Sequence, residues 1–415
     1  MRRMLIIIPA LALLTAGCVT VEKPAADDTP LPRGMVRPAV EARVRSARVE
    51  AALQPLGVVP FDGQVLPLVS PDGRHMAVEE GETPDWRALL ARDDAGPPVD
   101  TRVTIYEAGR NNVINKFTTG PGILLGRSCD DSGFLVEKIN ADSSRWIGYV
   151  AWDTGDMKWL VKDENINAFA FSGRDGSLAW CRRRAGESGF SLVFRAGVGE
   201  TELPAEGGSY FMPCLGNTDK LVFTWRVESD GRLNLLAIKF NDSLDDYELL
   251  AVQTIAAGTD ETAVYQSLAG VADPTGIFTG QKGKMLFFHP LLNRMAVFDI
   301  HKQEINVLDP LTMAGAWLPD GSLLLTRENE LVRRLLSTAA NINISDGRRV
   351  VSAGKNSDSP TYGSAGEAVV VVHKPLVPRA VPENIMPVLL FGPAGDSNAG
   401  LNRLSITRLK LIPAP

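Results

Sequence analysis

Catalytic and metal-binding signatures are scarce in this sequence. Its 415 residues include only four cysteines and four histidines, and none of the serine nucleophile elbows, phosphate-binding glycine loops or paired-histidine helices typical of common enzymes. The histidines lack the spacing that brings three or four zinc ligands together, and no calcium-loop pattern occurs. We therefore expect no cofactor, no metal and no recognisable catalytic residue. A propeller enzyme whose residues come from scattered loops stays open as an alternative.

Cysteine beyond position 18 is limited to Cys129, Cys181 and Cys214. An odd number cannot pair completely within one chain. We expect buried free thiols that act as small apolar groups, with a Cys181–Cys214 disulfide as the one alternative.

Long apolar runs are missing after residue 14. Arg2 and Arg3 precede the run Leu5–Leu14, which is too short to span a bilayer comfortably, so residues 1–17 are predicted to be an export signal. The segment Leu14-Thr15-Ala16-Gly17-Cys18 resembles the lipobox of bacterial lipoproteins, although Thr15 replaces the usual Leu. This resemblance implies that Cys18 is acylated and anchors the chain; a plain secretory signal is the alternative.

Charge and composition define the rest of the chain. Residues 18–50 contain four prolines and few large apolar groups, which predicts a disordered tether between a membrane and a domain at 51–415. Val19 stands where Asp would favour retention in the inner membrane, so we expect a cell-envelope protein on the outer membrane, facing the periplasm. The formal net charge is −6, which predicts no general attraction to nucleic acid.

One turn recurs along the domain. Its fullest copy is Leu68-Val69-Ser70-Pro71-Asp72-Gly73-Arg74-His75-Met76-Ala77-Val78, in which Pro-Asp-Gly reverses the chain between two apolar runs. Looser copies begin at residues 129, 172, 214, 273, 318 and 359, at intervals of 41–45 residues except for two of 59. Such a period, with about four short strands per unit, is the signature of a β-propeller blade.

We therefore predict an all-β fold, a β-propeller of about seven four-stranded blades, with six or eight as alternatives. Blade 2 shows the rhythm best, with strands predicted at Ile123–Arg127, Phe134–Lys138, Trp146–Asp153 and Met157–Val161. The last blade lacks a fourth strand. An N-terminal strand, Leu56–Phe61, is expected to complete it and close the ring.

The Ser-Pro-Asp-Gly turn resembles the repeats of the TolB-like propellers, a family of periplasmic and lipoprotein-borne WD-like domains. Only Ser70–Gly73 matches fully, and Pro319–Gly321 is close. The resemblance implies a ring that binds proteins or envelope polymers, and it implies no single activity.

Repeated side chains in these turns and strands have structural explanations. We expect the acidic turn residues to accept Asx-type hydrogen bonds rather than to ring a cation; they are Asp72, Asp131, Asp175, Asp219, Asp273 and Asp320. The tryptophans predicted to lie in strands are expected to pack between blades; they are Trp146, Trp152, Trp159, Trp180, Trp225 and Trp317.

Two long insertions are the candidate binding surface. The first, Glu79–Thr101, contains a predicted amphipathic helix at Asp85–Arg92; the second, Lys374–Asn402, contains an apolar stretch. Both are expected to connect strands 2 and 3 of neighbouring blades and to meet on one rim, where they either bind a partner or seal the ring. The candidate binding residues are Trp86, Leu89, Leu90, Ile385, Met386, Leu389, Leu390 and Phe391.

These features predict a membrane-tethered, non-catalytic module that binds an envelope protein or polymer. The alternatives are a hydrolase or lyase acting on a carbohydrate or peptide in the central channel, and a purely structural lipoprotein.

Overall fold

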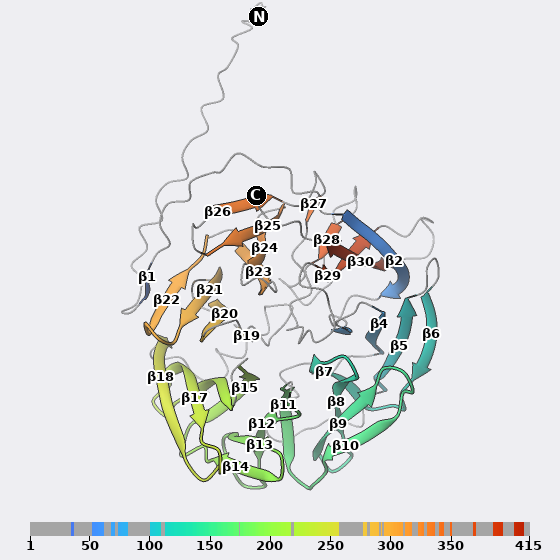
Figure 1. The fold of residues 1–415 in the computed structure, drawn as a ribbon. Coiled ribbons are helices and arrows are strands. Elements are labelled where there is room, and N and C mark those ends of the chain that lie inside the picture. Colours follow the sequence, from blue (N-terminus) through green and yellow to red (C-terminus); the bar gives the residue numbers. More distant parts are fainter. Residues whose placement is uncertain are drawn as a thin grey trace, which may run out of the picture. The chain divides into compact units, whose positions relative to one another are not determined.

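Mainly antiparallel β-sheets make up the described part of the chain, and no helix occurs in it (Figure 1). The computed structural model describes residues 35–36, 52–61, 68–70, 74–81, 100–108, 113–173, 175–216, 220–256, 277–279, 283–289, 292, 294–309, 312–317, 323–327, 330–336, 340–343, 349–350, 368–370, 385–392 and 402–410. No helix in these ranges is long and apolar enough to cross a bilayer. The predicted all-β class is confirmed.

Most strands of each sheet are consecutive in the sequence. The first has the order β3-β4-β5-β6, with bounds Leu68–Val69, His75–Glu80, Arg102–Ala108 and Val113–Thr118. Ser70 directly follows β3, and its hydroxyl accepts a hydrogen bond from the His75 amide at 2.8 Å. This bond closes the hairpin of the fullest repeat copy, as the turn sequence predicts.

An eight-stranded sheet follows, and it consists of two four-stranded meanders joined by one parallel bridge, Ile166 to Arg145. The first meander is β7 (Ile123–Cys129), β8 (Gly133–Ile139), β9 (Arg145–Ala151) and β10 (Met157–Val161). The second is β11 (Ile166–Ser172), β12 (Leu178–Arg183), β13 (Ser191–Ala196) and β14 (Gly199–Leu203). The strands predicted for blade 2 agree with the first meander to within two residues.

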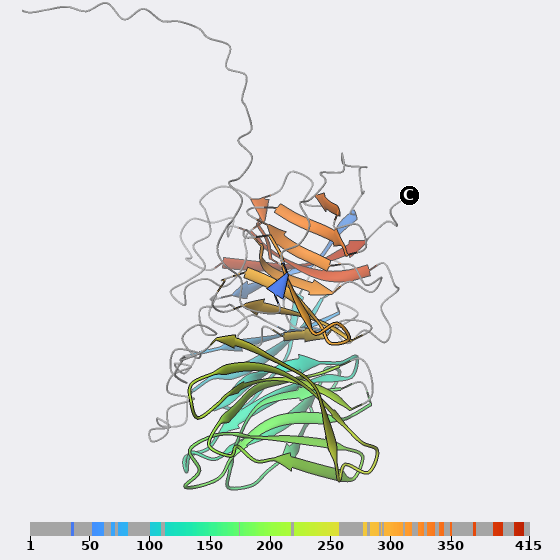
Figure 2. The same cartoon turned by 90° about the vertical axis from the view of Figure 1, so that its left-hand side faces the viewer.

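The third sheet, β15-β16-β17-β18, has bounds Ser209–Leu215, Leu221–Val227, Leu233–Phe240 and Tyr247–Ala256 (Figure 2). The fourth contains β19 (Ile277–Thr279), β20 (Lys284–His289), β21 (Arg294–Asp299) and β22 (Glu304–Val307), and a short N-terminal strand, β1 (Met35–Val36), pairs with β22. The fifth is β23 (Thr312–Trp317), β24 (Leu323–Arg327), β25 (Glu330–Leu335) and β26 (Ala340–Asn343).

The last sheet joins the two ends of the domain sequence. Its order is β2-β30-β29-β28-β27, with bounds Ala52–Phe61, Asn402–Lys410, Ile385–Gly392, Ala368–Val370 and Arg349–Val350. Strand β2 pairs antiparallel with β30, from Ala52 opposite Lys410 to Phe61 opposite Asn402. The segment predicted to complete the last blade, Leu56–Phe61, therefore pairs with the final strand.

The second predicted insertion, Lys374–Asn402, is not a connection throughout, because it contains a strand. Ile385–Phe391 was expected in a rim connection, but it lies in β29, between β28 and β30 in the sheet. The run is continuously apolar, which is typical of a short buried strand, and its Pro387 favours a connection only weakly.

The hydrophobic core lies between successive groups of about four strands. Trp152 packs with Leu68 and Val103 of the first sheet, and Trp180 packs with Leu135 of β8. The ring of Trp225 lies 5.7 Å from that of Phe287, in an edge-to-face contact between β16 and β20. These three tryptophans are buried and pack between neighbouring groups of four strands, as predicted for blades.

Trp146 behaves differently from these three. It is half-buried beside Trp159, with ring centroids 5.4 Å apart, and the ammonium groups of Lys138 and Lys162 lie 5.5 and 4.6 Å from its ring. It therefore takes part in cation–π contacts on its own meander.

Buried carboxylates also tie neighbouring strand groups together. Glu79 of β4 accepts a hydrogen bond from the Leu125 amide of β7 at 2.7 Å, and Glu137 of β8 accepts one from the Phe169 amide of β11 at 2.8 Å. The strand pairing shifts register at both donor amides, between Leu125 and Cys129 in β7 and between Ala168 and Phe171 in β11. The carboxylates thus satisfy amides that a bulge removes from the ladder.

Candidate functional site

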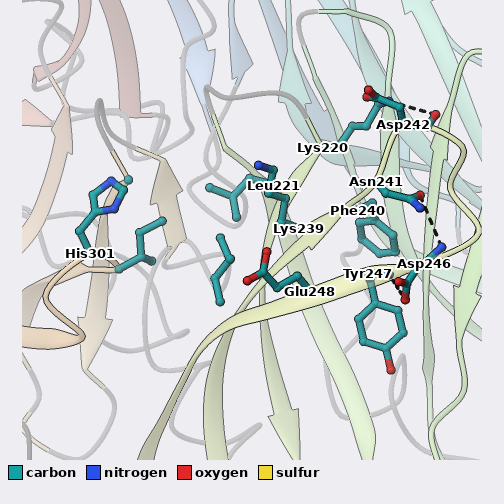
Figure 3. A pocket seen from close by; sticks show the side chains of 13 residues that line it. Lys220, Leu221, Lys239, Phe240, Asn241, Asp242, Asp246, Tyr247, Glu248 and His301 are labelled. Atoms are coloured by element: carbon teal, nitrogen blue, oxygen red, sulfur yellow. Dashed lines mark hydrogen bonds and ion pairs between the residues drawn. The ribbon is translucent and has the colours of Figure 1, made fainter.

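A groove of about 810 Å³ lies between the third and fourth sheets (Figure 3). Strands β17 and β18 and the turn that joins them form one wall. The turns that flank β20 and β21 form the other. We take this groove as the candidate functional site because it combines an open cavity with charged, aromatic and imidazole side chains from two sheets.

The first wall depends on an ordered turn, Asn241–Asp246. The Asn241 amide donates to the Asp246 carbonyl at 3.1 Å, and the Asp245 carboxylate accepts from the Ser243 hydroxyl at 2.5 Å and from the Asn241 side chain at 2.6 Å. These hydrogen bonds, that from Ser243 foremost, hold the pKa of Asp245 below its ordinary value of 3.8. The Thr201 hydroxyl of β14 donates to the Leu244 carbonyl and supports the turn from the preceding meander.

A lysine braces the same turn. The Lys220 ammonium lies 2.6 Å from the Asp242 carboxylate and also donates to the Asp242 carbonyl at 3.2 Å. The hydrogen bond from Lys220 and its positive charge lower the pKa of Asp242. Because Lys220 already has this partner, the more accessible cation of the groove is Lys239, which is exposed.

The second wall depends on a glycine. Gly283 has a φ of +69°, and a Cβ built there would lie 2.7 Å from Ile300 Cγ1 and 2.8 Å from His301 Nε2. The His301 ring therefore lies against bare backbone. Its own turn is fixed by Asp299, whose carboxylate accepts from the amides of His301 and Lys302 at 3.1 and 3.2 Å.

Two glutamines join the walls. The Gln253 side chain of β18 donates to the Gln303 carbonyl at 3.0 Å, and the Gln303 side chain donates to the Leu250 carbonyl at 3.3 Å. Glu248 lies opposite Lys239 in the β17–β18 ladder. Figure 3 shows Lys239 and Glu248 between His301 on one side and Tyr247 on the other. The groove thus offers both signs of charge and two aromatic hydrogen-bonding groups.

The edge beside the groove is unusually apolar. Strand β18 ends its sheet, and within the described ranges it pairs only with β17. Three of its large side chains are exposed, Tyr247 to 50%, Leu249 to 49% and Val252 to 44%. Exposed apolar side chains on a long edge strand are typical of strands that bind another polypeptide.

The residues predicted as sites are distributed elsewhere. Cys18, Trp86, Leu89 and Leu90 lie outside the described residues, and so does the predicted helix Asp85–Arg92. The remaining binding candidates lie on β29, as reported above; they are Ile385, Met386, Leu389, Leu390 and Phe391.

The cysteine prediction is confirmed, because Cys129, Cys181 and Cys214 are buried and do not form disulfides. The prediction for the acidic turns holds at Asp175, which accepts from the Ser177 amide at 3.0 Å. In the second repeat copy the acceptor is instead Asp130, which binds the amides of Ser132 and Gly133. Asp72, Asp219, Asp273 and Asp320 are outside the described residues.

Metal ligands do not gather in the described residues, where no group of three or more His, Cys, Asp or Glu is placed to hold an ion. Sequence reasoning missed the groove, because its walls come from segments about 40 residues apart. Part of the signal was present in Tyr247–Ala256, where Leu249 and Val252 fall on the exposed positions of an apolar strand.

Comparison with known proteins shows no family model and no curated protein that matches this chain. Solved structures do match. A puromycin-hydrolyzing peptidase of Mycobacterium tuberculosis is 12% identical with a TM-score of 0.45, over 90% of this chain and 58% of that one. Pyrococcus horikoshii acylaminoacyl peptidase is 10% identical with a TM-score of 0.44, over 86% and 53%.

A TolB protein of Agrobacterium tumefaciens is 11% identical with a TM-score of 0.34, over 59% of this chain and 80% of that one. The chain spans only about half the length of the two peptidases. At these identities and TM-scores the matches do not indicate the activity of this chain.

Proposed function

We propose that this chain is a lipid-anchored, seven-bladed β-propeller of the cell envelope that binds a protein partner without catalysis. The observation that carries the proposal is the exposed apolar edge of β18 beside the charged groove. A partner strand or loop can bury Leu249 and Val252 there while its polar groups reach Lys239 and Glu248.

The blade number is supported by the order of the strands. After β2, the strands fall into seven consecutive groups that begin at β3, β7, β11, β15, β19, β23 and β27. Each group contacts the next along the chain, and β2, paired with β30, contacts β5 and β6 of the first group. Contacts of this kind are what a ring closed by strand exchange requires.

Membrane attachment is supported by the sequence around Cys18. A short apolar run after two arginines, followed by a lipobox-like segment and a proline-rich stretch, is the arrangement of an acylated, tethered domain. Attachment through Cys18 on the outer membrane would leave the domain in the periplasm, where its partners are envelope proteins.

A protein partner is favoured over a polysaccharide by the chemistry of the edge. A chain of sugars is recognised by stacked aromatic rings and dense hydrogen bonding, whereas β18 presents two aliphatic side chains and one tyrosine. Aliphatic side chains exposed along an edge strand suit the apolar side chains of a polypeptide.

Site-specific photo-crosslinking in cells tests the proposal. A photoreactive amino acid is placed at Leu249, and in a matched variant at Val198, which is fully exposed on the β13–β14 turn. We expect a protease-sensitive adduct from position 249 and none from 198. The same products from both positions, or a 249 adduct that resists proteases and yields to glycosidases, would contradict a protein partner on β18.

A double variant, Leu249→Asp with Val252→Asp, should abolish the adduct while the protein stays folded, since both side chains are already half-exposed. Val198→Asp serves as its control. Retention of the adduct in the double variant would place the partner elsewhere.

A further inference from the structure

One two-residue strand lies far in sequence from its partner. β1, Met35–Val36, pairs parallel with β22, with Met35 opposite Ile305 and Val36 opposite Asn306. It comes from the region predicted to be a tether, and it adds a fifth strand to a sheet whose other four are consecutive. An edge strand otherwise leaves one row of backbone N–H and C=O groups open to other chains.

The sequence around β1 limits this pairing to a few residues. The segment reads Pro32-Arg33-Gly34-Met35-Val36-Arg37-Pro38, with one apolar pair between two prolines. Proline has no N–H to donate to a ladder, so regular pairing cannot extend through either end. The segment is therefore suited to a short strand addition and to nothing longer.

The acceptor strand is preformed. Ile305 and Val307 of β22 are buried, and β22 pairs with β21 through four consecutive residues. Its outer edge is held in an extended conformation by the rest of the sheet. Binding by strand addition then orders only the incoming segment.

We propose that the edge of β22 is a docking site for the chain's own segment Met35–Val36, which binds there reversibly and, when bound, shortens the N-terminal arm that precedes the domain. Two paired residues are a weak contact. The covalent link through residues 37–51 raises the local concentration of the segment to about the millimolar range, so a contact whose dissociation constant lies below that range is largely formed.

Docking changes the reach of the arm, if Cys18 is the anchor as proposed above. Residues 19–34 span at most about 55 Å when fully extended, whereas residues 19–51 span about 110 Å. The docked state therefore halves the distance at which the domain can work from the membrane, and release restores it.

Hydrogen exchange of the β22 amides in the full chain tests the docking. The variant Met35→Pro with Val36→Pro removes both N–H groups of β1. The control, Ala25→Pro with Ala26→Pro, stiffens the arm to the same degree outside the paired segment. We expect those of the Glu304–Val307 amides that point away from β21 to exchange at least about fivefold faster in the first variant and unchanged in the control.

Amides of β20 and β21 report whether the sheet itself is intact. Should the proline variant disturb them, Met35→Asp with Val36→Asp offers a milder change for the same measurement. Equal exchange of β22 in the wild type and in a variant with an intact sheet overturns the proposal.

A synthetic peptide of residues 31–40 supplies the complementary test. Added at millimolar concentration, it should restore protection to the variant, and a peptide with proline at both positions should not. Failure of the natural peptide overturns the proposal. So does protection that grows with protein concentration, because the occupant would then be a second copy.

Discussion

Glu137 and Arg145 form a buried ion pair whose removal should strongly destabilise the domain. Their charged atoms, Oε2 and Nη1, are 3.7 Å apart, and both residues are less than 10% exposed. Burial lowers the pKa of Arg145, the Glu137 carboxylate opposes this effect, and the nearby Arg183 guanidinium reinforces it. Without Glu137, two neighbouring guanidinium groups would lose the carboxylate beside them.

The size of the effect follows from the two contacts of the carboxylate. Breaking one side of a buried pair costs about 3–5 kcal/mol, and the hydrogen bond from the Phe169 amide adds about 1 kcal/mol. Glu137→Gln keeps an acceptor for Phe169, so we expect a loss of about 3 kcal/mol; Glu137→Ala should lose about 4 kcal/mol. The double variant Glu137→Met with Arg145→Met removes both charges and should lie within about 2 kcal/mol of the wild type.

Urea denaturation of the four proteins measures these differences in the free energy of unfolding. Asp230→Asn is the matched control, because the Asp230–Arg232 pair, at 2.7 Å, is exposed on both sides and should leave the midpoint unchanged. The reasoning is refuted if Glu137→Gln is as harmless as this control, or if the double variant is at least as damaging as Glu137→Ala.

Three further predictions concern the groove and the core. Gly283→Ala introduces a Cβ at a φ of +69° within 2.8 Å of His301, so it should destabilise the protein by about 1–2 kcal/mol and shift the His301 ring signals in NMR spectra. The Asp245 carboxyl should titrate below 3.8; the stability it contributes is present above pH 3.8 and lost as the pH falls through its folded pKa, and Ser243→Ala should raise that pKa in an NMR titration. A thiol reagent should modify three thiols only after unfolding, and fast reaction in the native protein would contradict their burial; they are Cys129, Cys181 and Cys214.

The sequence by itself determined the β-hairpins of this protein and the positions of many of its strands. Alternating apolar residues around a Pro-Asp-Gly or related turn specify a hairpin through neighbours only a few residues apart, which is why the strands near Ile123 and Met157 were placed correctly. The pairing of Leu56–Phe61 with the final strand could also be predicted, because a unit short of one strand needs an edge to be covered.

Only the tertiary structure decided which distant groups meet. The Glu137–Phe169 bond depends on a bulge that takes an amide out of the ladder, and the Gln253–Gln303 bridge depends on how two sheets pack. The docking of Met35–Val36 on β22 leaves no pattern in either segment. Such contacts arise from surfaces made by several strands together, whereas a sequence pattern reports the period of one strand at a time.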